Sequence, residues 1–220
     1  KRERVMPEEV KIRKFAVKDR AAVRQIAYDT ALMGKPAGLF FQGQETISDA
    51  LSLYFTDYEP GSCFVAEING SVVGYLSGAK KKIAAEVIFN CRIALPLLLK
   101  ALKSGIFLRK KNICFIFSCL IDLFRNGVHT PDFNQAYPAT FHLNIKDGFR
   151  GRKIGARLIH AYLDYLKIEK VPGVHLATMS EQAANFFLSL GFQQLYKGKR
   201  SYFRHILHRD VPLYIFGKRL

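Results

Sequence analysis

The stretch from residue 140 to residue 166 constrains the fold of this chain more than any other part of the sequence. In TFHLNI (140–145) polar and apolar residues alternate, which predicts a β-strand. The next residues are basic and rich in glycine. Apolar residues then recur three, four and seven apart, which predicts a helix that begins near Lys153 and buries one face: Ile154, Leu158, Ile159, Tyr162, Leu163 and Leu166. A strand, a basic loop and a helix N-terminus are therefore expected in direct succession.

A loop in this position is suited to phosphate. Backbone N–H groups and the helix dipole converge on an anion at a helix N-terminus, and glycine allows the backbone to approach closely. Arginine adds charge-assisted hydrogen bonds. Two features leave a second interpretation open: Lys153 stands where such loops usually have glycine, and a basic tract can also be ordinary surface charge.

The remaining pattern predicts a mixed α/β sheet. KIRKFAV (11–17) is a predicted strand, and the helix after it has Asp19 as its expected N-cap. Asn69-Gly70 joins two apolar runs and predicts a β-hairpin. VPGVHLATM (171–179) predicts a strand, followed by a helix capped by Ser180 and stopped at Gly191. Two further strands are expected, within LYKGKRSYFRHI (195–206) and VPLYIFGKRL (211–220). The order favours one sheet with helices on both faces.

Composition limits the class of protein. A length of 220 residues suits one domain, and a formal net charge of +16 favours anionic partners: nucleic acid, an acidic membrane surface or a phosphorylated cofactor. The four cysteines have no metal-binding spacing, so neither a metal site nor a disulfide framework is expected. A reducing, cytoplasmic location is expected instead. The N-terminal residues lack the apolar core of a secretory signal. ICFIFSCLIDLF (113–124) is too short to cross a bilayer.

Residues 80–127 form a predicted helical insertion. Its segment 80–125 holds ten Lys and Arg residues and two acidic ones, a net charge of +8. Helical spacing predicts one apolar face, and Pro96 predicts a kink or break. Ser104-Gly105 is the expected end of a first helix, and Gly127 is the expected end of a second. That apolar face consists of Ile83, Val87, Cys91, Leu95, Leu98 and Leu102. Either these helices cover the core and expose a basic face, or they form a surface for anionic lipid, nucleic acid or a partner protein.

Three of these pieces together resemble the GNAT superfamily of N-acetyltransferases. RGRKIGA (150–156) is similar to the family's Arg/Gln-x-x-Gly-x-Gly/Ala loop, and SEQAANFFLSLGF (180–192) follows the spacing of Asn-x-x-Ala-x-x-Phe-Tyr-x-x-x-Gly-Phe. The hairpin that ends in VVGYLSG is the third. Within the superfamily, YPATFHLNI and VPGVHL look most like bacterial relatives of the acetyltransferase-like domain of animal O-GlcNAc hydrolases.

The resemblance implies a GNAT-like, mostly antiparallel sheet and acetyl-CoA as cofactor, bound between the strands at 140–146 and 173–178. The backbone of Ile145 and Lys146 would pair with the pantetheine arm. Phe187 and Ser180 would lie beside the cofactor. Backbone N–H groups of the loop would hold the pyrophosphate: Arg150, Gly151, Arg152, Lys153, Ile154, Gly155 and Ala156. In this family an amine attacks the thioester directly.

Two departures from the family pattern bear on activity. Lys153 replaces the first loop glycine, and Phe187 replaces the tyrosine that commonly protonates the departing thiolate. A phenyl ring has no proton to donate. Possible substitutes are Ser180, where the family usually has asparagine, and terminal tyrosines such as Tyr202 or Tyr214, although no spacing singles out any of them.

His142 and Asn144 are the expected catalytic residues. They lie two apart on the predicted strand and so share a face with Thr140. The ordinary pKa of histidine is near neutrality, which suits His142 to the role of general base. A purely structural His142 is the alternative, and His175 on the next strand is suited to either role. His160, His205 and His208 are expected to be solvent-exposed.

The sequence thus leads to three hypotheses: an acetyl-CoA-dependent N-acetyltransferase, a GNAT-shaped module without turnover, and an anion-binding protein that acts through the basic insertion. The positive field favours an acidic peptide, an amino sugar or a neutral amine as acceptor over a polycation. Either a monomer or a homodimer fits the sequence.

Overall fold

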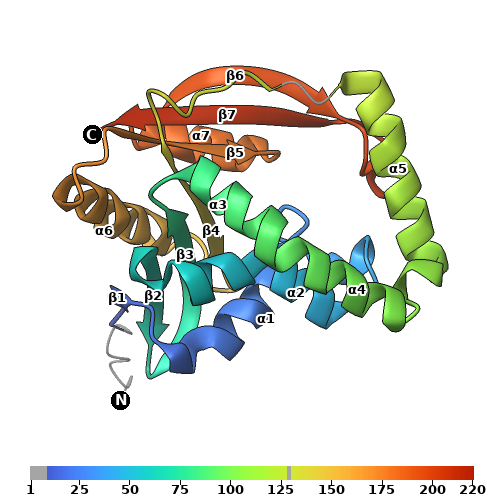
Figure 1. The fold of residues 1–220 in the computed structure, drawn as a ribbon. Coiled ribbons are helices and arrows are strands. Elements are labelled where there is room, and N and C mark those ends of the chain that lie inside the picture. Colours follow the sequence, from blue (N-terminus) through green and yellow to red (C-terminus); the bar gives the residue numbers. More distant parts are fainter. Residues whose placement is uncertain (1–8, 128–129) are drawn as a thin grey trace, which may run out of the picture.

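A seven-stranded sheet forms the centre of the computed structural model, which describes residues 9–127 and 130–220. The strand order is β1-β2-β3-β4-β5-β7-β6 (Figure 1). Only β4 and β5 are parallel, and every other neighbouring pair is antiparallel. This confirms the mixed, mostly antiparallel sheet. The strands are β1 (Lys11–Lys14), β2 (Cys63–Ile68), β3 (Ser71–Ala79), β4 (Ala139–Ile145), β5 (Gly173–Thr178), β6 (Gln193–Arg200) and β7 (Val211–Arg219).

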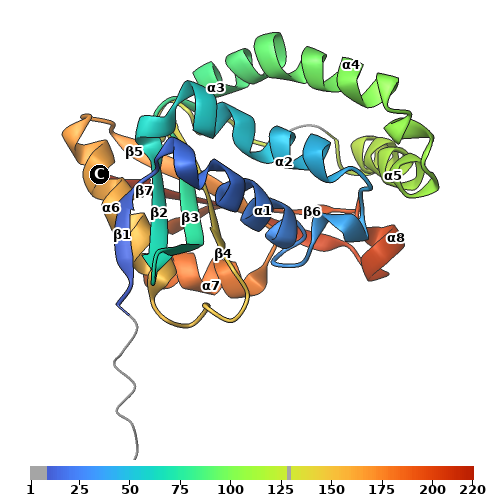
Figure 2. The same ribbon diagram turned by 90° about the horizontal axis from the view of Figure 1, so that it is seen from below.

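Helices cover both faces of the sheet, as the sequence predicts (Figure 2). Alternate side chains of a strand point to opposite faces, so Val65 packs with α1 (Arg20–Thr30), whereas Phe64 packs with α6 (Ile154–Ile168). The α6 face holds the largest apolar cluster, to which α7 (Glu181–Ser189) contributes.

Several local predictions are confirmed. Asn69 and Gly70 both have positive φ, 50° and 77°, as a two-residue hairpin turn requires. The hydroxyl of Ser180 accepts a hydrogen bond from the Ala183 N–H at 3.3 Å and caps α7. Gly191, with φ of 76°, ends that helix.

Other local predictions were wrong or incomplete. Asp19 precedes α1 but its carboxylate does not cap it, because it accepts from the Ala16 N–H and pairs with Arg13 at 2.6 Å. Part of the predicted strand 195–206 is helix α8 (Arg204–Leu207), which follows the end of β6. Helix α2 (Gln44–Leu53) was not predicted, and it continues as a π-helical turn over Tyr54–Tyr58.

The predicted helical insertion lies between β3 and β4. It consists of α3 (Lys82–Ile88), a π-helical segment (Phe89–Ala94), α4 (Leu95–Lys103) and α5 (Lys110–Asn126). Pro96 stands in the first turn of α4 and does not break the helical run, because the π-helical segment before it changes the hydrogen-bond pattern where the proline N–H is missing. Gly105 and Gly127 have positive φ at the predicted helix ends.

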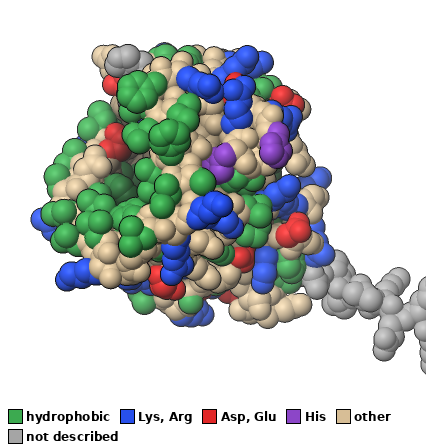
Figure 3. Space-filling view, turned by 90° about the vertical axis from the view of Figure 1, so that its right-hand side faces the viewer, with side chains coloured by type: hydrophobic (Ala, Val, Ile, Leu, Met, Phe, Trp, Pro, Cys, Tyr) green, Lys and Arg blue, Asp and Glu red, His purple; other side chains and the backbone are tan. Residues whose placement is uncertain are grey.

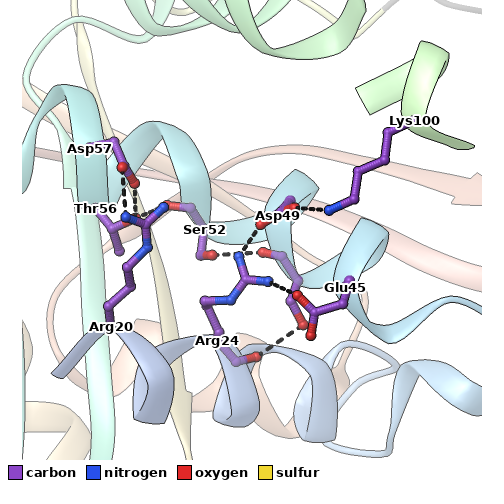
Figure 4. Close-up of polar contacts among 9 residues, drawn as sticks. Arg20, Arg24, Glu45, Asp49, Ser52, Thr56, Asp57 and Lys100 are labelled. Atoms are coloured by element: carbon purple, nitrogen blue, oxygen red, sulfur yellow. Dashed lines mark hydrogen bonds and ion pairs between the residues drawn. The ribbon is translucent and has the colours of Figure 1, made fainter. Parts of the chain in front are cut away.

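Ion pairs connect this insertion to the core helices (Figure 4). Arg24 of α1 pairs with Asp49 and, at 2.7 Å, with Glu45, both on α2. Lys100 of α4 lies 3.6 Å from the other oxygen of the Asp49 carboxylate. Asp49 therefore joins α1, α2 and α4.

Two predictions concern membranes and targeting. Across the described ranges, none of the helices has the length and apolarity to cross a bilayer. Residues 1–8, which carry most of the N-terminal stretch that was judged to lack a secretory signal, lie outside the described residues.

Candidate functional site

The strands β4 and β5 pair over only two positions and then separate. Ala139 is opposite Val174 and Thr140 is opposite His175, and no further pair joins the two strands. Since β4 continues to Ile145 and β5 to Thr178, their C-terminal halves form an opening in the middle of the sheet.

One edge of this opening carries unpaired backbone groups of β4. In an antiparallel ladder, successive residues point their N–H and C=O groups alternately toward and away from the neighbouring strand. The Lys146 N–H donates to the Val73 carbonyl of β3 at 2.8 Å, and the register continues Tyr75 with Asn144 and Leu76 with Leu143. The N–H groups of Leu143 and Ile145 therefore point away from β3, into the opening.

Lys146 differs from the expectation for it. Its N–H is bonded to β3, and its carbonyl accepts from the Phe149 N–H at 3.2 Å. Its backbone is thus already engaged, whereas Leu143, which the sequence analysis did not name, has its N–H on the open edge.

The basic loop follows β4 and ends at the N-terminus of α6, as predicted. The N–H groups of Ile154, Gly155 and Ala156 are the first of this helix and have no carbonyl partner within it. Gly151 has φ of 78° and Lys153 has φ of 59°, so both adopt the left-handed conformation. A side chain is strained in this conformation, so glycine would fit position 153 with less strain than lysine.

Gly155 also has a packing role. A Cβ at this position would lie 3.2 Å from Cζ of Phe186 and 3.4 Å from the side chains of Leu143 and Ile145. The absence of a side chain lets α6 approach both α7 and β4.

The arginines of the loop are held by specific contacts. The Arg150 guanidinium donates to the Ile145 carbonyl at 3.3 Å and to the Gly34 carbonyl at 3.2 Å. The Arg152 guanidinium lies 5.1 Å from the centre of the Phe149 ring. Arg150 is therefore positioned against the open end of β4, where it adds positive charge beside the N-terminus of α6.

A cavity of about 490 Å³ lies on the face of β4 and β5 that carries His142 and His175. Its floor includes His142 on β4, His175 on β5 and Ile215 on β7. Aromatic side chains of the π-helical turns and of the 130–134 segment form much of its wall: Tyr54, Phe55, Phe89 and Phe133. Lys82, Glu86 and Asp132 also line it, so both signs of charge are present. The cavity could hold a small amine or a peptide end.

His142, Asn144 and Thr140 share one face of β4, as predicted, and His142 and Thr140 line the cavity. The His142 ring is exposed to this hollow and meets the Phe55 ring edge-on, with 5.4 Å between ring centres. Desolvation by the surrounding protein lowers the pKa of His142 below 6.5, so the ring is neutral at pH 7. Asn144 donates from its amide to the Tyr75 hydroxyl at 2.8 Å and is thereby oriented.

His175 is buried, and its Nδ1 lies 2.5 Å from the Tyr137 carbonyl. That oxygen can only accept, so Nδ1 carries the proton and Nε2 is the basic nitrogen. Burial lowers the pKa of His175. His175 is therefore a second neutral imidazole at the cavity, held more rigidly than His142.

Phe187 is buried in an aromatic cluster. Its ring centre lies 6.0 Å from that of Phe141, 5.6 Å from Phe192 and 6.1 Å from Phe216. No hydroxyl is available at this position. The two substitute tyrosines are also buried or bonded: Tyr214 belongs to the same apolar cluster, and the Tyr202 hydroxyl lies 2.9 Å from the sulfur of Met179.

Three other histidines are exposed, as expected: His160, His205 and His208. His205 is additionally within 3.0 Å of the Ser118 hydroxyl. Sequence reasoning missed the aromatic wall of the cavity: no element was predicted around Phe55, and the helical spacing around Phe89 does not show that this part of the insertion packs beside β4.

Several solved structures with the same fold are described as acetyltransferases. SsHAT is 21% identical over 96% of this chain and 98% of its own, with a TM-score of 0.70. YncA from Salmonella typhimurium, described as an acetyltransferase and solved with its cofactor acetyl-CoA, is 16% identical over 96% and 94%, with a TM-score of 0.58. Polyamine N-acetyltransferase from Drosophila melanogaster, which forms N-acetylagmatine, is 16% identical over 96% and 100%, with a TM-score of 0.55.

These likenesses establish that the chain has the GNAT fold. No protein-family model and no curated protein sequence matches it.

Proposed function

We propose that this chain is an N-acetyltransferase that moves an acetyl group from acetyl-CoA to a primary amine. The observation that carries the proposal is the opening between β4 and β5, with a helix N-terminus on one side and a cavity lined by His142 and His175 on the other. The likeness in fold to acetyltransferases supports it.

The residues present fit acetyl-CoA. The N–H groups of Ile154, Gly155 and Ala156, with the loop from Arg150 to Lys153, would hold the pyrophosphate. The N–H groups of Leu143 and Ile145 lie along the open edge, where pantetheine amides would need donors. Acetyl-CoA would supply an activated thioester at the opening.

The amine must lose a proton when it forms the amide. His142 faces the cavity and has a lowered pKa, so it can accept this proton at pH 7 directly or through one water. An N–H group of the β4 edge would donate to the carbonyl oxygen as negative charge builds up on it. Asn144, fixed by Tyr75, would keep the strand face in position.

The second candidate function is a GNAT-shaped module that binds CoA or a partner protein with little or no turnover. Phe187 favours it, because this buried ring cannot protonate a departing thiolate. From the resemblance of YPATFHLNI and VPGVHL, we further propose that the nearest relatives are the bacterial proteins similar to the acetyltransferase-like domain of animal O-GlcNAc hydrolases.

Two measurements test these functions. Calorimetric titration with acetyl-CoA should show binding in either case, and absence of binding at millimolar concentration would contradict both. Release of free thiol is then followed with amino sugars, acidic peptides, neutral amines and polyamines. Turnover with any acceptor that His142→Gln strongly reduces supports the enzyme, and binding without turnover across the panel supports the inactive module.

A further inference from the structure

Helix α5 is oriented with its polar residues inward. Its buried residues are Asn112 and Asp122. The Asn112 side chain makes two hydrogen bonds with the backbone of Gln42. Its Nδ2 donates to the Gln42 carbonyl at 2.8 Å, and its Oδ1 accepts from the Gln42 N–H at 2.6 Å. The Asp122 carboxylate accepts from the N–H of Ser201 and, at 2.9 Å, from its hydroxyl. Phe115 lies on the same side and packs against Phe40, with 4.8 Å between ring centres, so polar and aromatic contacts together fix which side of α5 faces the protein.

The outward side of α5 is consequently apolar. Phe117 is 62% exposed and Phe124 is 88% exposed. The exposed residues recur at helical spacing and form one stripe: Ile113, Ile116, Phe117, Leu120, Leu123 and Phe124. An amphipathic helix of a water-exposed domain normally buries such a stripe.

Helix α4 repeats this arrangement. It buries Ala101 against the protein, and Lys100 reaches inward to Asp49. Its leucines at spacings of three and four are all about half exposed: Leu95, Leu98, Leu99 and Leu102. Figure 3, which views the molecule from the α5 side, shows hydrophobic side chains gathered around a hollow on one half of this face.

The outward surface of α4 and α5 is here called the α4–α5 face. Its apolar character contradicts the interpretation that the insertion covers the core and exposes only a basic face. The apolar residues of the insertion that were predicted to share a helix face are exposed, Ile83, Val87 and Cys91 among them. The insertion therefore does not simply cover the core with apolar side chains and expose basic ones.

Exposed basic side chains lie at or near the ends of α4 and α5. The exposed ones include Arg92, Lys103, Arg109, Lys110 and Arg125. A surface that combines exposed leucine and phenylalanine with lysine and arginine matches the boundary between lipid headgroups and acyl chains. Each basic residue close to an anionic membrane contributes about 1 kcal/mol of attraction.

We propose that the α4–α5 face binds the surface of an anionic lipid bilayer. The apolar stripes would enter the headgroup region while the basic side chains contact lipid phosphates. A second copy of the chain is a poorer occupant, because each copy carries a formal net charge of +16 and the two would repel. Nucleic acid offers the negative charge but no counterpart for the apolar stripes.

This inference does not depend on acetyl transfer. The helical run that carries α4 also forms a wall of the cavity, through Ala85, Glu86 and Phe89. Membrane binding would thus bring the cavity close to the lipid surface.

The test is sedimentation of the full chain with vesicles of phosphatidylcholine alone or with 30% phosphatidylglycerol. We expect binding only to the anionic vesicles, and at least tenfold weaker binding when NaCl rises from 0.1 to 0.5 M, since the Debye length falls from about 10 Å to about 4 Å. The double variant Leu98→Ser/Leu102→Ser should bind about tenfold more weakly, because less apolar area leaves water. Lys103→Gln/Lys110→Gln should also weaken binding.

Two matched variants serve as controls on distant surfaces. Ile168→Ser removes an apolar residue that is 78% exposed at the end of α6. Lys11→Gln/Lys18→Gln removes the same charge from the β1 side. Both should bind like the original chain. No binding to anionic vesicles, or equal losses in the control variants, would overturn the proposal. A dimer that becomes monomeric in Leu98→Ser/Leu102→Ser, or RNA binding lost in that variant without any vesicle binding, would assign the face to another partner.

Discussion

Replacing Lys153 by glycine should stabilise the fold slightly and weaken binding of acetyl-CoA. Lys153 has φ of 59° and ψ of 11°, in the left-handed region. A non-glycine residue pays about 1–2 kcal/mol there. Glycine avoids that strain but loses about 0.5–1 kcal/mol through the larger freedom of the unfolded chain. The net gain in unfolding free energy is roughly 0.5 kcal/mol, or about 1–2 °C in Tm for a domain of this size.

The effect on the ligand comes from the lost ammonium group. Lys153 is exposed, so its interaction with a phosphate is screened and is worth about 0.2–1 kcal/mol. The Kd for acetyl-CoA should therefore rise about 1.4- to fivefold in Lys153→Gly. Lys153→Gln should lose the same affinity without the gain in stability, because it keeps the strained backbone.

A control for the strain exists at the other end of α6. Lys170 is also exposed and has φ of 55°, but it lies beyond the C-terminus of this helix, away from the loop. Lys170→Gly should raise Tm by a similar amount and leave the Kd for acetyl-CoA unchanged. Urea unfolding and calorimetric titration at low salt measure both quantities. If Lys153→Gly lowers stability while Lys170→Gly raises it, the strain argument for the loop is wrong. If the affinity of Lys153→Gly for acetyl-CoA is unchanged or higher, the loop acts through its backbone alone.

Three further outcomes are expected. In the original chain the acetylation rate should fall as pH drops through the lowered pKa of His142, below 6.5, because only the neutral ring accepts a proton. His142→Gln should reduce the rate by about 10²-fold or more and abolish this decline at low pH. An unchanged pH profile in that variant would contradict the role of His142 as the base. Phe187→Ala should lower the unfolding free energy by about 3–5 kcal/mol in urea titration, since it empties a space among aromatic rings; a loss below 1 kcal/mol would show that the ring is not core. Asp122→Ala should cost about 3 kcal/mol, because the N–H and hydroxyl of Ser201 lose their buried acceptor, and a neutral result would contradict the inward orientation of α5.

Local chemistry explains what could be predicted about the candidate site. The loop after β4, the start of α6 and the common face of His142 and Asn144 follow from strand alternation and helical spacing, which are properties of neighbouring residues. The sequence also shows Lys153 where phosphate-binding loops usually have glycine, but the backbone strain at this residue became clear only from its φ value. The cavity wall was not predictable, because Phe55 and Phe133 reach it from segments separated by more than 70 residues.

The sequence by itself determined the types and order of most elements: the Asn-Gly hairpin, the strand-loop-helix from Thr140 onward and the helices of the insertion. It also determined that the insertion carries an apolar stripe and a positive charge. Only the tertiary structure decided which way that stripe faces. Periodicity gives the width of an apolar face but not its direction, and the direction here is set by long-range contacts: Asn112 bonds to Gln42, Asp122 bonds to Ser201, and Phe115 packs against Phe40. Those contacts hold one side of α5 against the protein and leave its larger apolar stripe exposed.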